Sequence, residues 1–260
     1  MLTKNERNSI KSLRTRENRH RLNRMVVEGS KGVLELLNSS LITERIYVTS
    51  GFECSTIKSV AKEKCVDVCE VSSKDMEIMS SLKNAPGVLA VGEIIYSSVD
   101  QIISIVNSSE SEVPTILLLD DLVDPGNVGT LIRTALWFGF AGVVCSPRTA
   151  DVWNSKAIQS SMGSVFYMPI VVQDLDDFLT SNAIQCIALD AGGISIYESD
   201  KIPGAIIVGS ESHGISEILL KNVDEIWSIP GGGSAESLNA SIAGSIACSV
   251  VSKTWSDLNS

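Results

Sequence analysis

The sequence predicts an α/β protein of two domains, and three observations lead to this prediction. The chain has 260 residues, 44% of them hydrophobic, which is enough for two buried cores. In the second half, short apolar strands alternate with helical patterns, as in a parallel sheet covered by helices on both faces. Between the halves, the polar stretch NSSESEV is typical of a linker. We therefore expect domains at residues 1–96 and 114–260, joined by a linker at 97–113.

The period of the apolar residues places the elements of each domain in order. In the first domain we expect helices near 5–20, 29–37, 55–64 and 73–81, and strands at 46–48, 66–71 and 87–95. In the second we expect strands at 115–119, 142–145, 165–170, 187–189, 205–208 and 225–229, and helices at 127–138, 152–161 and 238–254. The second domain is thus predicted to contain the parallel sheet.

The net charge of −10 alone argues against a nucleic-acid partner, but the distribution of charge reverses that impression. Residues 1–31 hold nine Lys or Arg against three Glu, and the rest of the chain carries the remaining 12 of 21 basic and 28 of 31 acidic residues. A basic segment on an acidic body is typical of proteins that bind a phosphate backbone. A solvated helix face is the alternative, and the charge pattern does not decide between them.

Several classes of protein are excluded by composition. The first residues are charged throughout, and no apolar run approaches the roughly 18 residues of a membrane span. The six Cys form no CxxC pair and the chain has two His, so we expect free thiols and no metal site. We expect a soluble cytoplasmic protein that binds no membrane. A bacterial origin is favoured, and an organellar protein without its transit peptide is the alternative.

The first unusual segment follows the predicted strand at 115–119. Asp124-Pro125-Gly126 predicts a turn, and Asn127 is a suitable N-cap for the helix at 127–138. Arg133 lies on that otherwise apolar helix and needs an anionic partner. The partner is either a bound anion or an internal carboxylate such as that of Asp120 or Asp121.

Two further segments combine glycine with polar residues where strands end. In AIIVGSESHGIS, glycines on both sides of Glu211 permit a tight turn and close approach of backbone to a ligand. In SIPGGGSAESLNASIAGS, a glycine loop leads into a helix whose small residues permit close helix packing. Neither GxGxxG after a first strand nor GxxxxGK[ST] is present, so dinucleotide and P-loop sites gain no support.

In this order, NVGTLIR, IVGSESHGIS and IPGGGSAESLNASIA resemble the three motifs of the SpoU (TrmH-like) RNA 2′-O-ribose methyltransferases of the SPOUT superfamily. The stretch KAIQSSMGSVFYMPI also resembles a segment of that family. RENRHRLNRMVVEGSKGVLELL and NAPGVLAV resemble the small α/β substrate-binding domain, similar to ribosomal protein L30e, that precedes many SpoU catalytic domains.

The resemblance implies a fold, a cofactor and a partner. It implies that the SPOUT domain has a deep trefoil knot at its carboxyl-terminal segment and that the protein is a homodimer. It implies S-adenosylmethionine as the cofactor, with the adenosyl group held by backbone around Gly209, Ile229 and Leu238.

The resemblance also implies the catalytic residues, which are Asn127, Arg133, Glu211, Ser237 and Asn239. Arg133 is either a base or a phosphate clamp, and because a guanidinium stays protonated in almost any setting, we favour the clamp. Asn127 and Asn239 would orient the loops and the ribose hydroxyl, and Glu211 would fix the second and third motif loops.

Three positions depart from the family pattern: Gln159 where Arg is common, Ser212 where Gly is common, and Gly231 where Met often follows IP. None belongs to the catalytic set, although Gln159 removes a charge that could contact RNA.

The sequence therefore predicts 2′-O-methylation of a ribose in structured RNA, with ribosomal RNA favoured over transfer RNA because the separate first domain suits a ribosomal loop. The alternatives are a tRNA 2′-O-methyltransferase, a catalytically silent RNA-binding or ribosome-assembly protein of the same fold, and an unrelated nucleotide-binding oxidoreductase.

Overall fold

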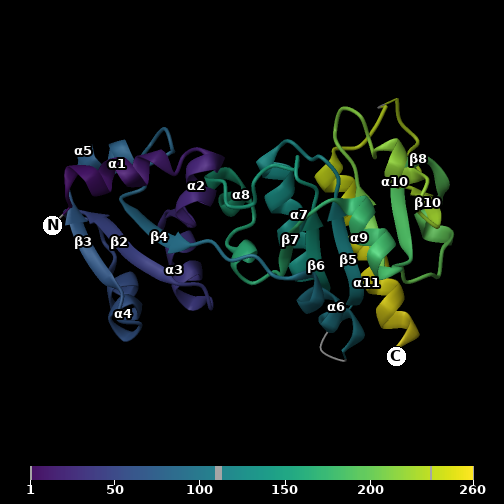
Figure 1. The fold of residues 1–260 in the computed structure, drawn as a ribbon, viewed down its shortest axis with the longest axis horizontal. Helices are drawn as coiled ribbons and strands as arrows, with labels where there is room; N and C mark the ends of the chain where they lie inside the picture. The colour runs from purple at the N-terminus through teal and green to yellow at the C-terminus, as the bar shows by residue number, and fades with distance from the viewer. Residues whose placement is uncertain (1, 109–112, 235, 260) are drawn as a thin grey trace. The chain divides into compact units, whose positions relative to one another are not determined.

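The structure is a computed structural model that describes residues 2–108, 113–234 and 236–259 (Figure 1). The chain divides into two compact units, each with its own sheet. One unit comprises residues 1–95 and 151–167, and the other comprises residues 96–150 and 168–260. Residues 151–167 come from the middle of the second predicted domain but belong to the first unit.

The first unit contains a mixed four-stranded sheet in the order β1-β4-β2-β3. Strand β4 is antiparallel to both β1 and β2, and β2 is parallel to β3. The strands are β1 (Arg24–Glu28), β2 (Thr43–Thr49), β3 (Asp67–Val71) and β4 (Val88–Glu93). Strand β1 lies within the basic segment of residues 1–31 and was not predicted.

Helices cover both faces of this sheet, with α1 and α5 on one side and α3 and α4 on the other (Figure 1). The helices are α1 (Lys4–Ser12), α2 (Arg16–Leu22), α3 (Ser30–Asn38), α4 (Ser55–Glu63), α5 (Ser73–Met79), α8 (Ser155–Ser160) and the 3-10 turn η1 (Ser164–Phe166). Thr3 begins α1 with a capping box to Glu6, and the Thr15 and Ser72 hydroxyls cap α2 and α5.

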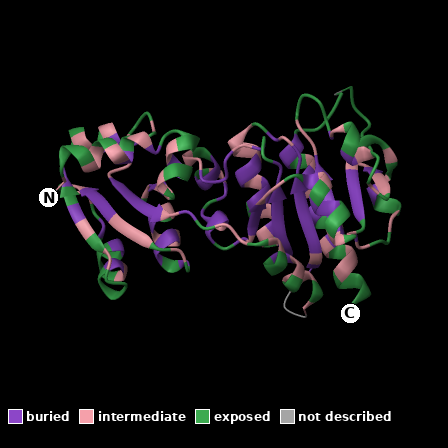
Figure 2. Ribbon diagram, viewed as in Figure 1, coloured by how far each residue is buried: buried purple, intermediate pink, exposed green. Residues whose placement is uncertain are grey.

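The second unit is built on a fully parallel six-stranded sheet in the order β10-β8-β9-β5-β6-β7, as predicted. The strands are β5 (Val113–Leu119), β6 (Phe140–Cys145), β7 (Ile170–Val172), β8 (Cys186–Ser195), β9 (Ala205–Val208) and β10 (Glu225–Ser228). Figure 2 shows most of this sheet as buried. Burial on both faces explains why the strands are apolar without alternation.

The sheet is covered by α6 (Val99–Asn107), α7 (Pro125–Trp137), α9 (Leu175–Asn182), α10 (Glu217–Leu220) and α11 (Ala240–Leu258), with the 3-10 turn η2 (Ile196–Glu198). Ile102 of α6, Phe178 of α9 and Leu219 of α10 share one buried cluster with strand residues such as Ile116 and Ile207. Helices α7 and α11 pack against each other.

Helix α6 occupies most of the segment 97–113 that we assigned to a linker. Ser98 and Gln101 form a capping box at its start, and Ile102 is fully buried. The strand predicted at 165–170 also differs from the structure. Its first residues form the 3-10 turn η1, and β7 begins only at Ile170.

The six cysteines are free thiols, and all but Cys65 are buried. In the described parts of the chain, no helix has the length and apolar character needed to cross a membrane. Across the same residues, no group of three His, Cys, Asp or Glu side chains is placed to hold a metal ion.

Candidate active site

The three motif segments leave the same edge of the parallel sheet. The first follows β5, the second follows β9 and the third follows β10. Strands β5 and β9 are neighbours, and the chain continues from β5 toward β6 and β7 on one side, while β8 and β10 lie on the other. The order of the strands thus reverses between β5 and β9, and ligands of open α/β sheets bind outside the carboxyl ends of strands at such a point.

Asn127 is not the N-cap of α7, contrary to the sequence prediction. Asp124 caps the helix, with its Oδ1 accepting a hydrogen bond from the Gly126 N–H at 2.6 Å, and Pro125 takes the first helical position. The helix therefore begins two residues earlier than predicted. Because the cap is provided by Asp124, the Asn127 amide is available for other partners.

A chain of hydrogen bonds joins the three segments. Asn127 Nδ2 donates to Glu211 Oε1 at 2.6 Å, and Asn239 Nδ2 donates to Asn127 Oδ1 at 3.2 Å. Three of the five predicted catalytic residues therefore meet, although 84 and 112 positions of sequence separate Asn127 from its two partners. Glu211 reaches the third segment through Asn127 rather than directly.

Asn239 is held in place by a second task, which is to cap α11. Its Oδ1 accepts hydrogen bonds from the Ser241 N–H at 2.9 Å and from the Ile242 N–H at 3.3 Å. Because the oxygen of the amide is used by the helix, the nitrogen faces Asn127 as a donor.

Glu211 lies at the tip of a small closed loop. Ser210 and Gly214 exchange two backbone hydrogen bonds of 3.0 and 2.9 Å, and Gly214 has a φ of +67°, which favours glycine. A Cβ at Gly209 would collide with the backbone of Gly214. The requirement for glycine at 209 therefore comes from the turn of the chain itself, before any ligand is considered.

The helix that follows the third motif packs closely on α7, as its small residues predict. Thr134 and Ser245 hydroxyls lie 3.1 Å apart across the contact. A Cβ at Gly244 would come within 2.5 Å of Leu131 Cδ2 and within 3.0 Å of Val208 Cγ2. This contact brings the amino-terminal ends of α7 and α11 to the same edge of the sheet.

Arg133 is exposed on α7, and the two carboxylates considered as its partners are engaged elsewhere. Asp120 accepts a hydrogen bond from the Ser216 N–H at 2.8 Å, and Asp121 accepts one from Arg148 Nε at 2.8 Å. In the described part of the chain, no group pairs with the Arg133 guanidinium. The alternative of an internal carboxylate at Asp120 or Asp121 is therefore wrong.

The two aspartates at the end of β5 have opposite pKa shifts. Burial raises the pKa of Asp120, which is 4% exposed, despite the hydrogen bond from Ser216. Burial also acts on Asp121, but hydrogen bonds from Arg148 and Ser146 outweigh it and lower its pKa. Asp120 ties the end of β5 to the start of α10, a positioning role that sequence reasoning missed, although a carboxylate directly after a buried strand signals it.

The remaining predicted residues lie along the second and third segments. Gly209 and Ile229 are half-buried directly after β9 and β10, and Ser237 and Leu238 are exposed before α11. Within the described residues, the Ser237 side chain makes no hydrogen bond, so the structure does not join it to Asn127, Glu211 and Asn239.

The third segment offers groups that fit an adenosyl ligand. A Cβ built at Gly231, Gly232 or Gly233 would meet no atom within 4 Å, so this backbone is open to approach. Leu238 and Ile242, which follow this loop in sequence, are 48% and 51% exposed. Open backbone donors and acceptors next to aliphatic side chains suit a planar heterocycle with polar edges.

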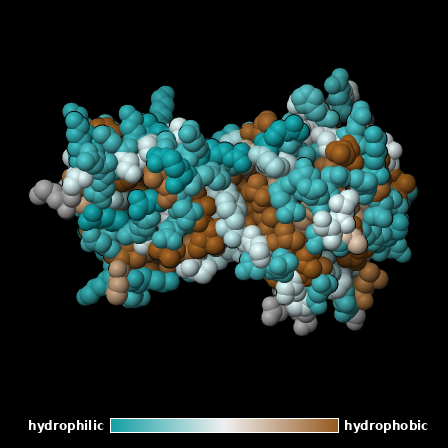
Figure 3. Space-filling model, in the orientation of Figure 1, coloured by the Kyte–Doolittle hydropathy of each residue, from teal (hydrophilic) through white to brown (hydrophobic). Residues whose placement is uncertain are grey.

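The basic segment of the first unit is partly consumed by internal contacts. Arg7 pairs with Asp75 at 2.6 Å, Arg24 with Glu44 at 2.7 Å, and Arg19 is buried. Six of its basic residues are exposed: Lys4, Lys11, Arg14, Arg16, Arg21 and Lys31. In Figure 3 much of the visible surface over α1 and α5 is hydrophilic.

Two family profiles match the chain. Residues 114–249 match the SpoU rRNA Methylase family, and residues 5–90 match the MRM3-like substrate binding domain. The first match contains all three motif segments, and the second contains the whole four-stranded sheet except the end of β4.

Similar proteins include a curated relative and two solved structures. The chain is 30% identical over 257 residues to the 23S rRNA (guanosine(2553)-2′-O)-methyltransferase RlmP of Bacillus subtilis. This alignment covers 91% of each chain. It is 25% identical to the AdoMet-bound rRNA methyltransferase from Sinorhizobium meliloti, with a TM-score of 0.82 over 97% of this chain and 96% of that one. The SpoU methyltransferase AviRb from Streptomyces viridochromogenes, in complex with AdoMet, has the same fold at 22% identity, with a TM-score of 0.82 over 96% of this chain and 98% of that one.

Proposed function

The chain belongs to the SpoU rRNA Methylase family, and from this we propose that it transfers a methyl group from S-adenosylmethionine to a ribose 2′-hydroxyl of ribosomal RNA. The observation that carries the proposal is the hydrogen-bonded chain of Asn239, Asn127 and Glu211 beside an exposed Arg133 that has no partner among the described residues.

Family membership confirms several predictions made from the sequence. The α/β catalytic domain with a preceding substrate-binding domain, the class of RNA methyltransferase and S-adenosylmethionine as the cofactor are confirmed. The alternative of an unrelated nucleotide-binding oxidoreductase is wrong.

When bound, S-adenosylmethionine supplies a methyl group that is already activated by its sulfonium. The protein then has to orient the ribose hydroxyl and accept its proton. Glu211 uses Oε1 for Asn127, and its Oε2 is available to accept the hydrogen of the hydroxyl. Asn127 and Asn239 each keep one amide N–H for the ribose, and Ser237 stands exposed before them as a further hydroxyl donor.

Arg133 is assigned to holding an RNA phosphate. The guanidinium stays charged and is exposed on α7. Its N–H groups contact no carboxylate among the described residues. A phosphate next to the target ribose would supply the partner that the chain itself does not provide. The adenosyl group is assigned to the backbone of Gly209, Ile229 and Leu238, beside the open glycine loop.

Ribosomal RNA is the favoured substrate because the Bacillus subtilis and Sinorhizobium meliloti proteins are both named for it. The exposed basic residues of α1 and α2 would hold its phosphates, with affinity that falls steeply as salt rises. Transfer RNA stays the alternative substrate.

A homodimer is proposed from the surface of α7. Trp137 is 82% exposed one helical turn after Arg133, and Val123 is 67% exposed before the helix. Trp137 ends α7 and Val123 lies just before it, and exposed apolar side chains of this size suit a surface that is covered by a partner. We extend the proposal to the trefoil knot, which the family resemblance implies, and to a cytoplasmic location and domains at 1–96 and 114–260, which the sequence predicts.

The proposal is tested by incubating the protein with methyl-labelled S-adenosylmethionine and total RNA that lacks its native 2′-O-methyl groups. We expect label in ribosomal RNA with the wild type, and a rate lower by about 100-fold with Arg133→Ala, as for the loss of one charge-stabilising donor. Label in transfer RNA would show that transfer RNA, rather than ribosomal RNA, is the substrate. If no RNA class is labelled although the cofactor binds, the proposed methyltransferase activity is contradicted and the catalytically silent alternative is favoured.

A further inference from the structure

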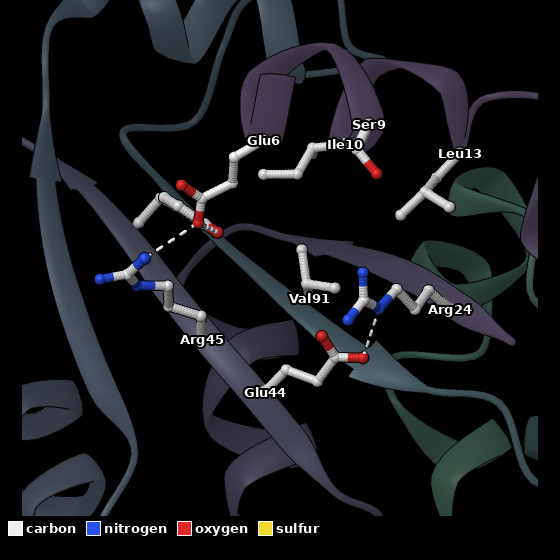
Figure 4. A pocket seen from close by; sticks show the side chains of 9 residues that line it. Glu6, Ser9, Ile10, Leu13, Arg24, Glu44, Arg45 and Val91 are labelled. Atoms are coloured by element: carbon white, nitrogen blue, oxygen red, sulfur yellow. Dashed lines mark hydrogen bonds and ion pairs between the residues drawn. The ribbon is translucent and has the colours of Figure 1, made fainter. Parts of the chain in front are cut away.

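A pocket of about 340 Å³ lies in the first unit, between α1 and the strands β1, β2 and β4 (Figure 4). None of the residues assigned to catalysis or to the cofactor lines it. We propose that this pocket receives one unpaired nucleobase of the RNA substrate, an inference that rests on the proposed function.

The charges in the pocket cancel. Glu6 pairs with Arg45 at 2.9 Å, and Arg24 pairs with Glu44 at 2.7 Å. Figure 4 shows these two ion pairs on either side of Val91. Because two carboxylates face two guanidiniums, neither a free phosphate nor a metal cation gains net attraction. A neutral ligand with both donors and acceptors suits these walls.

Between the ion pairs, the surface is apolar. Ile10 and Leu13 of α1 and Val91 of β4 are buried and form this part of the lining. The Tyr47 hydroxyl donates to Glu6 Oε1 at 2.7 Å, so Glu6 is held from two sides. An apolar surface with polar groups at both ends matches the face and the edges of an aromatic heterocycle.

Hydrogen-bonding capacity is left over in both ion pairs. Arg24 uses Nε for Glu44, and its terminal nitrogens bond to no other described residue; Glu44 likewise keeps its second oxygen. Arg45 Nε is buried and has no acceptor among the described residues. A donor next to an acceptor is the pattern that the Watson–Crick edge of a base complements.

The size and surroundings favour a base within RNA. Small-ligand sites run from roughly 300 to 1,000 Å³, so this pocket is at the lower end and suits one ring system. Lys4 and Lys11 are exposed on α1, the helix that forms one wall, and they supply positive charge for the flanking phosphates. A protein side chain as the occupant would not need these charges.

Nuclear magnetic resonance of the 15N-labelled full chain tests the proposal, with adenosine, cytidine, guanosine and uridine as probes. We expect at least one nucleoside to shift the Nε–Hε signals of Arg24 and Arg45. Ser9→Phe, which fills the pocket from α1, should weaken this binding at least tenfold. Glu44→Gln, which keeps the shape but replaces an acceptor, should change the order of preference among the four nucleosides.

Asp67→Asn is the matched control, because Asp67 is the other partner of Arg45 but does not line the pocket. This variant should bind as the wild type does. Affinity for ribosomal RNA should fall at least fivefold in Ser9→Phe and stay unchanged in Asp67→Asn. The proposal is overturned if no nucleoside moves the arginine signals, or if Ser9→Phe keeps full affinity for ribosomal RNA.

Methyl transfer by the wild type is measured separately. If methyl transfer fails while a nucleoside still binds in this pocket, the proposed function is rejected and the proposal of a nucleobase site is kept. If methyl transfer succeeds and the pocket stays empty, this inference alone is lost.

Discussion

Two arginines, one in each unit, stand in opposite environments. Arg19 of α2 is 4% exposed and has every donor group engaged. Its Nε donates to Asp151 at 2.7 Å, a terminal nitrogen donates to the same carboxylate, and the other donates to the Leu13 and Arg14 carbonyls at 2.9 and 3.0 Å. Arg133 of α7 is exposed and pairs with no described residue.

This contrast separates the charges that the fold itself requires from those that it leaves exposed. A buried guanidinium must find its partners inside the chain, and Arg19 does so with the segment at 151–167. An exposed one on an apolar helix costs little to leave unpaired, so Arg133 is free for a partner that comes from outside. Arg19 is therefore structural, and Arg133 is the one that we propose as a binding group.

The largest effect is expected for Arg19→Ala, which removes the guanidinium from the buried Asp151 carboxylate. We expect a loss of about 3–5 kcal/mol in the free energy of unfolding, measured by urea denaturation. Arg19→Met combined with Asp151→Leu removes both charges and should recover most of the loss. If Arg19→Ala unfolds like the wild type, the ion pair is not structural.

The chain of side chains at the sheet edge is tested by Asn127→Ala. Loss of a hydrogen bond to a charged group costs about 1.5–3 kcal/mol, so kcat/KM should fall by about 10- to 100-fold with little change in stability. Glu211→Gln keeps an amide oxygen that can accept from Asn127 but removes the carboxylate that we propose to accept the ribose proton, so kcat/KM should fall while this hydrogen bond stays. An unchanged kcat/KM in Asn127→Ala would show that the hydrogen-bonded chain does not serve catalysis.

Close packing of α11 on α7 predicts that Gly244→Ala destabilises the second unit. The added methyl group would press on Leu131, and overpacking outweighs the gain in helix propensity, with a net loss of about 1 kcal/mol. Ser249→Ala on the exposed face of the same helix should be neutral. Thermal unfolding of the two variants compares them directly, and a stabilised Gly244→Ala would contradict the packing argument.

The smallest expected effect concerns pH. The pKa of Asp121 is lowered in the folded protein, so its contribution to stability is present above the unfolded value of 3.8 and is lost as pH falls through the folded pKa. Because Arg148 is 80% exposed, we expect less than about 1 kcal/mol. In Asp121→Asn, the free energy of unfolding should fall less steeply below pH 4 than in the wild type. An equally steep fall would show that the Asp121–Arg148 pair does not contribute to acid stability.

The elements with strong apolar periods could be predicted from the sequence. Strand β9 lies at the predicted residues 205–208, and the parallel sheet follows from apolar strands such as β5 and β6. Strand β1 was missed because it lies within the basic segment, which we interpreted from its charge rather than from its short apolar run. Helix α6 was missed because the polar residues that follow it led us to interpret the whole of 97–113 as a linker.

The site could be predicted only in part. The residues were identified through motifs, but their geometry depends on contacts across 84 and 112 positions, which no local pattern contains. For the same reason Asn127 was taken for a cap, since local spacing could not show that Asp124 takes that role. The exposure of Arg133 likewise became visible only when Asp120 and Asp121 were found with other partners.

The central claim is that the partner of Arg133 is a phosphate of RNA. The most direct measurement is the salt dependence of ribosomal RNA binding by the wild type and by Arg133→Ala. For one lost phosphate contact, the slope of log affinity against log salt should become shallower by roughly 0.7–0.9. Equal slopes for the two proteins would contradict the claim.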